Sequence, residues 1–170
     1  MGGSFMIKTF SLKRLYIISL LIFLLALLFA FFYTKPVPTK GIAHQKVIID
    51  FSFIFLNNLK VSLLLILLGP LTLGLGTLIV LVINGLILGS ALGSIKDNLS
   101  LVSLLAPHGI IEIPILLLAA SIGFKMVINV FSMKIDFKFV FKYLLIVIGG
   151  LLIAASIETF VTPMFLKGAL

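Results

Sequence analysis

Residues 59–95 read LKVSLLLILLGPLTLGLGTLIVLVINGLILGSALGSI, an apolar stretch broken only by Lys60, a few hydroxyl groups and Asn84. A bilayer core about 30 Å thick is crossed by about 20 helical residues, so this stretch is too long for one span. Gly69 and Pro70 supply a break near its middle, because glycine allows tight turns and proline lacks a backbone donor. The stretch therefore predicts two membrane spans, at 58–72 and 75–95.

The whole chain has the composition of an integral membrane protein. Of its 170 residues 62% are hydrophobic and 11% are charged, whereas soluble domains have about a quarter of their residues charged. Further spans are expected at 15–33, 107–124 and 140–162. The fold class expected is all-α, a polytopic transmembrane helical bundle of about five spans in one membrane domain over residues 1–170. Residues 1–5 precede a second methionine and are typical of an addition left by expression.

Short apolar segments between the spans predict extra interfacial or re-entrant helices. Residues 47–58 are apolar but include Asp50, and residues 99–106 reach only about 12 Å as a helix, too short to cross. Lys134, Lys138 and Lys142 would form one basic stripe on a lipid-surface helix, with a strand as the alternative. The helix breaks expected from glycine and proline are Gly69, Pro70, Pro107, Gly109, Pro114 and Pro163.

Charge indicates the partners and the orientation. The formal net charge is +8, from 13 Lys and Arg against 5 acids. In so apolar a chain these cations are expected to touch anionic lipid headgroups, and no nucleic-acid partner is expected. Counting cations at the span ends favours an N-terminus inside the cell and a C-terminus outside, in a multi-pass protein of the plasma membrane. The absence of cysteine excludes disulfides and thiolate metal sites.

Polar side chains at matching depths form the candidate functional cluster. With this topology they gather in one layer of the outer leaflet, with Asn84 beneath: Asn57, Asn58, Asn84, His108, Glu112 and Glu158. Acids within a membrane usually pair or face a wet cavity. Structural hydrogen bonding between helices, an ion or proton path, and catalysis are the alternatives. His108, Glu112 and Glu158 are weak candidates for a metal. No cofactor is expected.

Small residues predict close helix packing. Gly85, Gly89 and Gly93 recur every four residues, two G-x-x-x-G units in tandem, and Gly150 repeats the theme more weakly. Such a stripe lets another helix approach closely. Packing within one chain and a homodimer seam are both open from the sequence, and a homo-oligomer is expected.

Four segments together resemble a known family. FLNN, INGLILG, PHGIIEIP and IETFVTP make residues 51–164 similar to the stage II sporulation protein M family of bacterial and archaeal membrane proteins. The family's characteristic positions correspond to Asn57, Asn58, Asn84, Gly85, Gly89, Pro107, His108, Gly109, Glu112, Glu158 and Pro163. The protein that names the family acts as a membrane anchor for cell-wall-degrading partners during engulfment. This chain shows no feature specific to sporulation, so the resemblance implies the fold more than that role.

Three functions follow from these patterns. The first is a non-enzymatic scaffold or anchor for membrane or cell-envelope proteins. The second is a small transporter or channel that uses the His/Glu/Asn layer. The third and weakest is an intramembrane hydrolase. A transporter needs an accessible path lined by the polar layer, whereas a scaffold would bury these groups in mutual hydrogen bonds.

Overall fold

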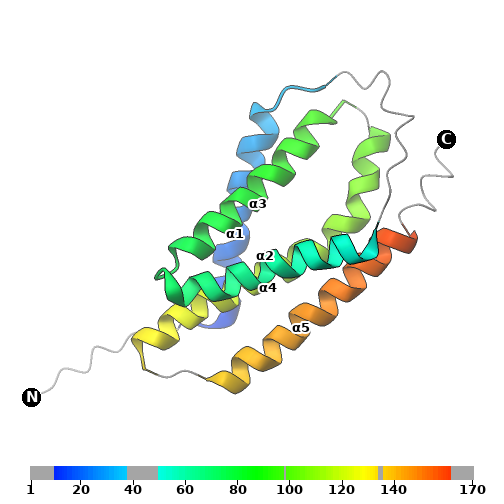
Figure 1. The fold of residues 1–170 in the computed structure, drawn as a ribbon. Coiled ribbons are helices and arrows are strands. Elements are labelled where there is room, and N and C mark those ends of the chain that lie inside the picture. Colours follow the sequence, from blue (N-terminus) through cyan, green and yellow to red (C-terminus); the bar gives the residue numbers. More distant parts are fainter. Residues whose placement is uncertain (1–9, 38–49, 98, 134–135, 162–170) are drawn as a thin grey trace, which may run out of the picture.

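The computed structural model describes residues 10–37, 50–97, 99–133 and 136–161, which form five long helices and a final π-helical turn (Figure 1). The elements are α1 (Leu12–Tyr33), α2 (Phe51–Leu71), α3 (Leu75–Ser94), α4 (Leu99–Phe131), α5 (Phe137–Ser156) and the turn η2 (Ile157–Val161). Each long helix contains a segment long and apolar enough to cross a membrane, and no described residue lies in a strand. The expected all-α polytopic bundle is thus confirmed.

Side-chain caps set where three of the helices begin. The Asp50 carboxylate accepts hydrogen bonds from the backbone N–H groups of Ser52 (2.7 Å) and Phe53 (3.3 Å), at the start of α2. Asp136 accepts from the N–H of Phe139 at 3.0 Å at the start of α5, and Ser11 caps α1. An oxygen at the N-cap satisfies amide groups that have no partner within the helix. Residues 51–58, expected as a separate interfacial helix, are therefore the first two turns of α2.

The reversal between α2 and α3 lies beyond the predicted break. Gly69 and Pro70 are both inside α2, because a proline near the helix end removes only one backbone bond. The chain turns instead at Leu73 and Gly74, whose φ angles are 54° and 93°. The N–H of Gly74 donates to the carbonyl of Gly69 at 2.8 Å, the closing bond typical of a left-handed helix end. The Thr72 hydroxyl accepts from the first turn of α3 at 2.7 Å.

Helix α4 continues through its expected breaks. Pro107, Gly109 and Pro114 lie inside one helix from Leu99 to Phe131, so residues 99–106 are its beginning and not a separate re-entrant piece. Each proline removes a single backbone bond, which bends a supported helix without ending it. Figure 1 shows the resulting bend between the upper and lower parts of α4. Pro163 lies outside the described residues.

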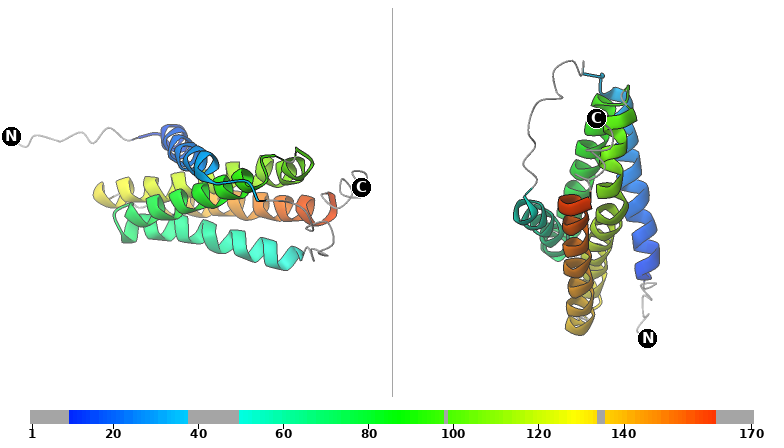
Figure 2. Two further views of the ribbon diagram at one scale, coloured as in Figure 1. Left: turned by 90° about the horizontal axis from the view of Figure 1, so that it is seen from above. Right: turned by 90° about the vertical axis from the view of Figure 1, so that its right-hand side faces the viewer.

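The helices pack around α4, which contacts all four of the others. Both views in Figure 2 place α1 and α2 on opposite flanks of the bundle. The largest fully buried apolar side chains come from α2, α3, α4 and α5: Leu65, Leu81, Leu117, Ile122, Val147 and Leu151. The core therefore includes residues of α2 on one flank as well as residues of the helices between the flanks.

Polar contacts tie α1 to its neighbours at both ends. The Lys96 ammonium, just after α3, donates to the carbonyl of Thr34 at 3.1 Å, and the N–H of Val37 donates to the carbonyl of Ser94 at 2.9 Å. At the other end, the Lys125 ammonium donates to the carbonyl of Phe10 at 3.0 Å. Helices α1 and α3 consequently run parallel, with their C-terminal ends side by side.

The tandem glycines of α3 face α1 within the same chain. A Cβ atom added at Gly85 or Gly93 would lie 2.8 Å from a carbonyl oxygen of α1, and one added at Gly89 would overlap the carbonyl of Leu27. The α1–α3 contact is also the most extensive helix contact in the bundle. The stripe is thus covered by α1 of the same chain, and a homodimer through another surface stays a prediction.

A second close crossing joins α2 to α4. A Cβ at Gly69 would overlap the backbone of Gly123, and one at Gly123 would overlap the carbonyl of Leu65. Beside this point the Thr77 hydroxyl donates to the same Leu65 carbonyl at 2.7 Å, which joins α3 to α2. Gly150 packs differently, against the side chain of Ile115.

Accessibility labelling tests the alternation of the spans. Because the chain has no cysteine, a thiol reagent labels only the single cysteine that is introduced. We expect Phe10→Cys and Met133→Cys to be labelled from one side of the membrane, and Val37→Cys and Asp97→Cys from the other. Labelling of Phe10→Cys and Val37→Cys from the same side would contradict a membrane-crossing α1.

Alanine substitution tests the α1–α3 contact. We expect Gly89→Ala to lower the free energy of unfolding by about 1–3 kcal/mol, the usual cost of overpacking, because the new methyl group meets the rigid backbone at Leu27. Gly149→Ala is the matched control, since a Cβ there meets nothing within 4 Å. Denaturation in detergent measures both variants, and equal stability of the two would disprove the close contact.

Candidate binding pocket

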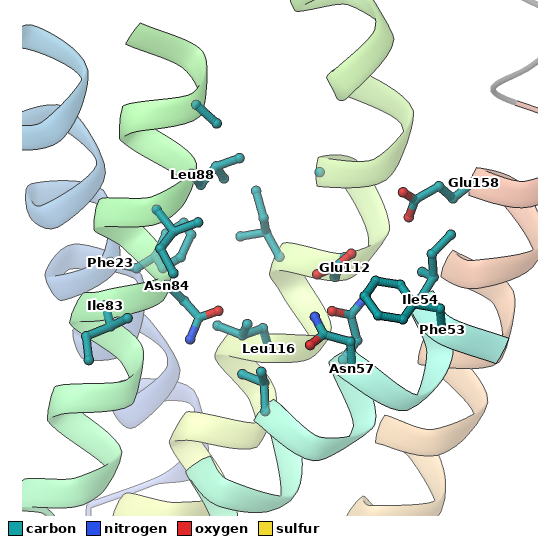
Figure 3. Close-up of a pocket in the computed structure, with 16 residues that line it drawn as sticks. Phe23, Phe53, Ile54, Asn57, Ile83, Asn84, Leu88, Glu112, Leu116 and Glu158 are labelled. Atoms are coloured by element: carbon teal, nitrogen blue, oxygen red, sulfur yellow. The ribbon is translucent and has the colours of Figure 1, made fainter. Parts of the chain in front are cut away.

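A cavity of about 550 Å³ lies between α2, α3, α4 and η2 (Figure 3). Its lining combines polar and apolar side chains: Phe23, Phe53, Ile54, Asn57, Asn58, Val61, Ile83, Asn84, Ile87, Leu88, Ala91, Gly109, Glu112, Ile113, Leu116 and Glu158. The volume falls within the range of about 300–1,000 Å³ that is typical of small-molecule sites.

The cavity gathers most of the predicted polar layer. Asn57, Asn58, Asn84, Glu112 and Glu158 come from four different elements and all line it. In Figure 3 the labelled members of this group are directed toward one common space. The backbone of His108 belongs to α4, but its side chain lies outside the part that the structure describes.

The divergence of α2 and α3 produces the cavity. The two helices are tied together near their turn, where the Thr77 hydroxyl binds the carbonyl of Leu65. Away from the turn they separate, as Figure 1 shows. Asn57 and Asn58 lie in the half of α2 that has moved away, and Asn84 faces them from the middle of α3. The separation therefore leaves a space whose walls carry amide groups.

Glu158 reaches the cavity from an unusual helical turn. Residues 157–161 form the π-helical turn η2 directly after α5, and the N–H of Ile157 is shared between the carbonyls of Ile153 and Ala154. A π turn holds an extra residue, so it changes the direction of the side chains that follow the regular helix, and such turns are frequent at functional sites. In Figure 3 the Glu158 carboxylate is directed from η2 toward the side of α4 that carries Glu112.

The polar residues of the cavity are partly accessible, although one carboxylate oxygen of Glu112 is buried. Asn58, Asn84, Glu112 and Glu158 are half-buried, and Asn57 is exposed. One amide hydrogen of Asn84 binds the carbonyl of Val80 at 2.7 Å, within its own helix. A partly accessible set of carboxylates and amides can exchange ligands, which a fully buried hydrogen-bond network cannot do.

The metal hypothesis is not tested by these side chains. Glu112 and Glu158 share the cavity, while the imidazole of His108 lies outside the description. Among the described side chains no three His, Asp or Glu residues are grouped closely enough to hold a metal ion.

The sequence did not indicate the apolar part of the lining. Phe53, Ile83, Ile87 and Leu88 look like ordinary lipid-facing or core positions in any transmembrane helix. They line the cavity because α2 and α3 diverge, and that divergence depends on contacts between distant segments such as Gly69 with Gly123. No local pattern could have revealed it.

Comparison with known proteins identifies relatives of unknown activity. The sequence model described as stage II sporulation protein M matches residues 19–163, which include every lining residue of the cavity. An uncharacterized protein of Methanocaldococcus jannaschii is 36% identical over 166 residues, which cover 86% of this chain and 93% of the relative. No solved structure matches the chain significantly.

A double-mutant cycle tests whether the two carboxylates share one site. We expect Glu112→Gln and Glu158→Gln to be non-additive in free energy of unfolding by at least about 0.5 kcal/mol, as is usual for residues in one polar site. Thermal denaturation in detergent provides the measurement. Glu112→Gln combined with Asp136→Asn is the control and should be additive, because Asp136 lies at the opposite end of α5. Additivity of both pairs would contradict a shared site.

Proposed function

This chain belongs to the stage II sporulation protein M family, and we propose that it is a small, non-enzymatic membrane transporter that binds a cationic group in the cavity between α2, α3, α4 and η2. The observation that carries the proposal is the gathering of Glu112, Glu158 and three asparagines around one accessible space. Residues from four separate elements meet there, so the arrangement belongs to the tertiary fold and not to one amphipathic helix.

The chemistry of the lining favours a cation. Carboxylate and amide oxygens accept hydrogen bonds, and ionised carboxylates attract positive charge more strongly at low dielectric than in water. The described lining combines two acids with three asparagines and includes no lysine or arginine. Acidic groups inside a membrane domain commonly mark substrate or ion pathways.

A non-enzymatic role agrees with the same lining. Many hydrolases use a serine, threonine or cysteine nucleophile beside a general base. Among the described lining residues none is serine, threonine, lysine or tyrosine. The described lining therefore contains no serine, threonine or cysteine that could act as the nucleophile of an intramembrane hydrolase.

A scaffold or anchor for membrane and cell-envelope proteins is the second candidate. The two glycine crossings favour it, because backbone contact at Gly89 holds α3 tightly against α1, and contact at Gly123 holds α4 tightly against α2. A rigid frame could present a fixed outer surface to a partner. Such a role would not require a ligand in the cavity, and this difference allows the two candidates to be separated.

Ligand-dependent stability tests the transporter proposal. We expect ethylammonium chloride to raise the unfolding temperature of the detergent-solubilised protein relative to sodium chloride at equal ionic strength. At ten times the dissociation constant, binding contributes about 1.4 kcal/mol, or about 3–6 °C for a chain of this size. Glu112→Gln combined with Glu158→Gln should remove the effect. Asp97→Asn, an exposed acid outside the cavity lining, should retain it.

Transport is measured separately, as uptake of labelled ethylammonium into proteoliposomes. Stabilisation together with uptake that the double variant lacks would agree with the proposal. Binding without uptake would favour the scaffold, with the ligand as a structural component. No stabilisation by ammonium, alkali or alkaline-earth cations would contradict the assignment of the cavity as a cation site.

A further inference from the structure

We infer that the natural ligand of the cavity is a lipid with an ethanolamine-type headgroup, which enters sideways from the bilayer between α2 and α3. The inference rests on the proposed function, because it names the class of cationic group that the same cavity would bind. Three features carry it: exposed apolar side chains in the lining, acids on one side of the cavity with mostly apolar residues of α3 across from them, and a mixture of acids and amides among the polar groups.

The mouth of the cavity faces hydrocarbon. Phe53, Ile83 and Ile87 line the cavity, and 73%, 47% and 64% of their surfaces are exposed. Ile83 and Ile87 are about 12 and 18 Å along α3, at 1.5 Å per residue, and therefore lie well inside a bilayer core about 30 Å thick. A ligand that passes these side chains comes from the lipid and not from water.

The walls of the cavity differ in polarity. In Figure 3 Glu112 and Glu158 lie on the side of α4 and η2, whereas Ile83 and Leu88 lie across the cavity on α3, with the single amide of Asn84 between them. An amphiphile matches this division if its head contacts the acids while its chains lie along α3. A volume of about 550 Å³ suits a headgroup and the start of the chains, and the remaining length of the chains would stay in the bilayer through the mouth.

The polar wall matches a zwitterionic head. A primary ammonium has three N–H donors, which fit the carboxylates of Glu112 and Glu158. The amide NH₂ groups of Asn57 and Asn58 are donors that suit a phosphate, and Asn57 is exposed on the mouth side of α2. A choline head carries the same phosphate but no N–H donor. The structure therefore predicts a preference for ethanolamine over choline lipids.

A single tryptophan at the mouth provides the test. The chain has no tryptophan, so Ile87→Trp would give a fluorescence signal from one position. The variant is reconstituted in choline lipid with increasing fractions of lipid brominated on its chains, carrying either head. We expect the ethanolamine lipid to quench with about five-fold higher relative affinity, which corresponds to about 1 kcal/mol where tenfold is 1.4 kcal/mol. Ile79→Trp is the matched control, because Ile79 is 57% exposed on the same helix but does not line the cavity.

Glutamine variants of the two acids test whether Glu112 and Glu158 cause the headgroup preference. In the Ile87→Trp background, Glu112→Gln with Glu158→Gln should abolish the headgroup preference, and Asp97→Asn should preserve it. The two brominated lipids should quench Ile79→Trp equally in every background. Equal quenching of Ile87→Trp by the two lipids would overturn the inference, as would a preference of the same size at Ile79→Trp.

Native mass spectrometry of the protein without the tryptophan provides a second test, in which no indole can block the mouth. The two lipids compete at equal concentration, and more bound ethanolamine lipid in the wild type than in the double glutamine variant is expected. Equal binding of both lipids to the wild-type protein would refute the lipid assignment. If ethylammonium still stabilised the protein, the cation site would stand with a water-soluble ligand, and if it did not, both proposals would fail.

Discussion

Backbone contact at glycine is the interaction on which the rest of this structure depends. Within a bilayer, lipid chains are as apolar as leucine, so helices associate through close packing and polar contacts rather than through burial from water. Gly85, Gly89 and Gly93 bring α3 against α1, and Gly69 with Gly123 brings α2 against α4. Each member of the α2–α3 hairpin is thereby held by a different partner. The hairpin opens because its two halves follow those partners, and the cavity is the space that results.

The division into two helix pairs also explains why polar residues are tolerated where they occur. Asn84 and Glu112 would be costly on a sealed helix interface, since buried polar atoms need partners there. Between two diverging pairs they face a cavity that a polar ligand can enter. The apolar residues beside them, such as Ile87, are at the same time part of the outer surface. The same geometry thus places acids and an opening toward the lipid at one level of the bundle.

Sequence reasoning was most successful where the bilayer itself constrains the chain. The number of spans follows from hydrophobic length, and the common depth of Asn58, Glu112 and Glu158 follows from counting residues inward from the ends of adjacent spans. Sequence reasoning failed where contacts between segments distant in the sequence determine the local structure. Pro114 was expected to break a helix that neighbouring helices hold together, and Leu73 adopts a left-handed conformation that its side chain gives no reason to expect. Gly123 has no repeating pattern, so its contact with Gly69 was not foreseen.

The position of the hairpin turn limits how a transport motion could occur. If α1 with α3 and α2 with α4 move as units, their relative movement must be absorbed where the chain passes from α2 to α3. Leu73 and Gly74 have left-handed backbone angles there, and the Thr72 hydroxyl bonds both helices, donating to the carbonyl of Leu68 at 2.6 Å and accepting from the N–H of Gly76 at 2.7 Å. These bonds hold the turn, while Asn57 lies several helical turns away in α2. A small rotation about the turn would therefore change the width of the mouth far more than it changes the contact at Thr77, so the cavity could open to the lipid without loss of the glycine crossings.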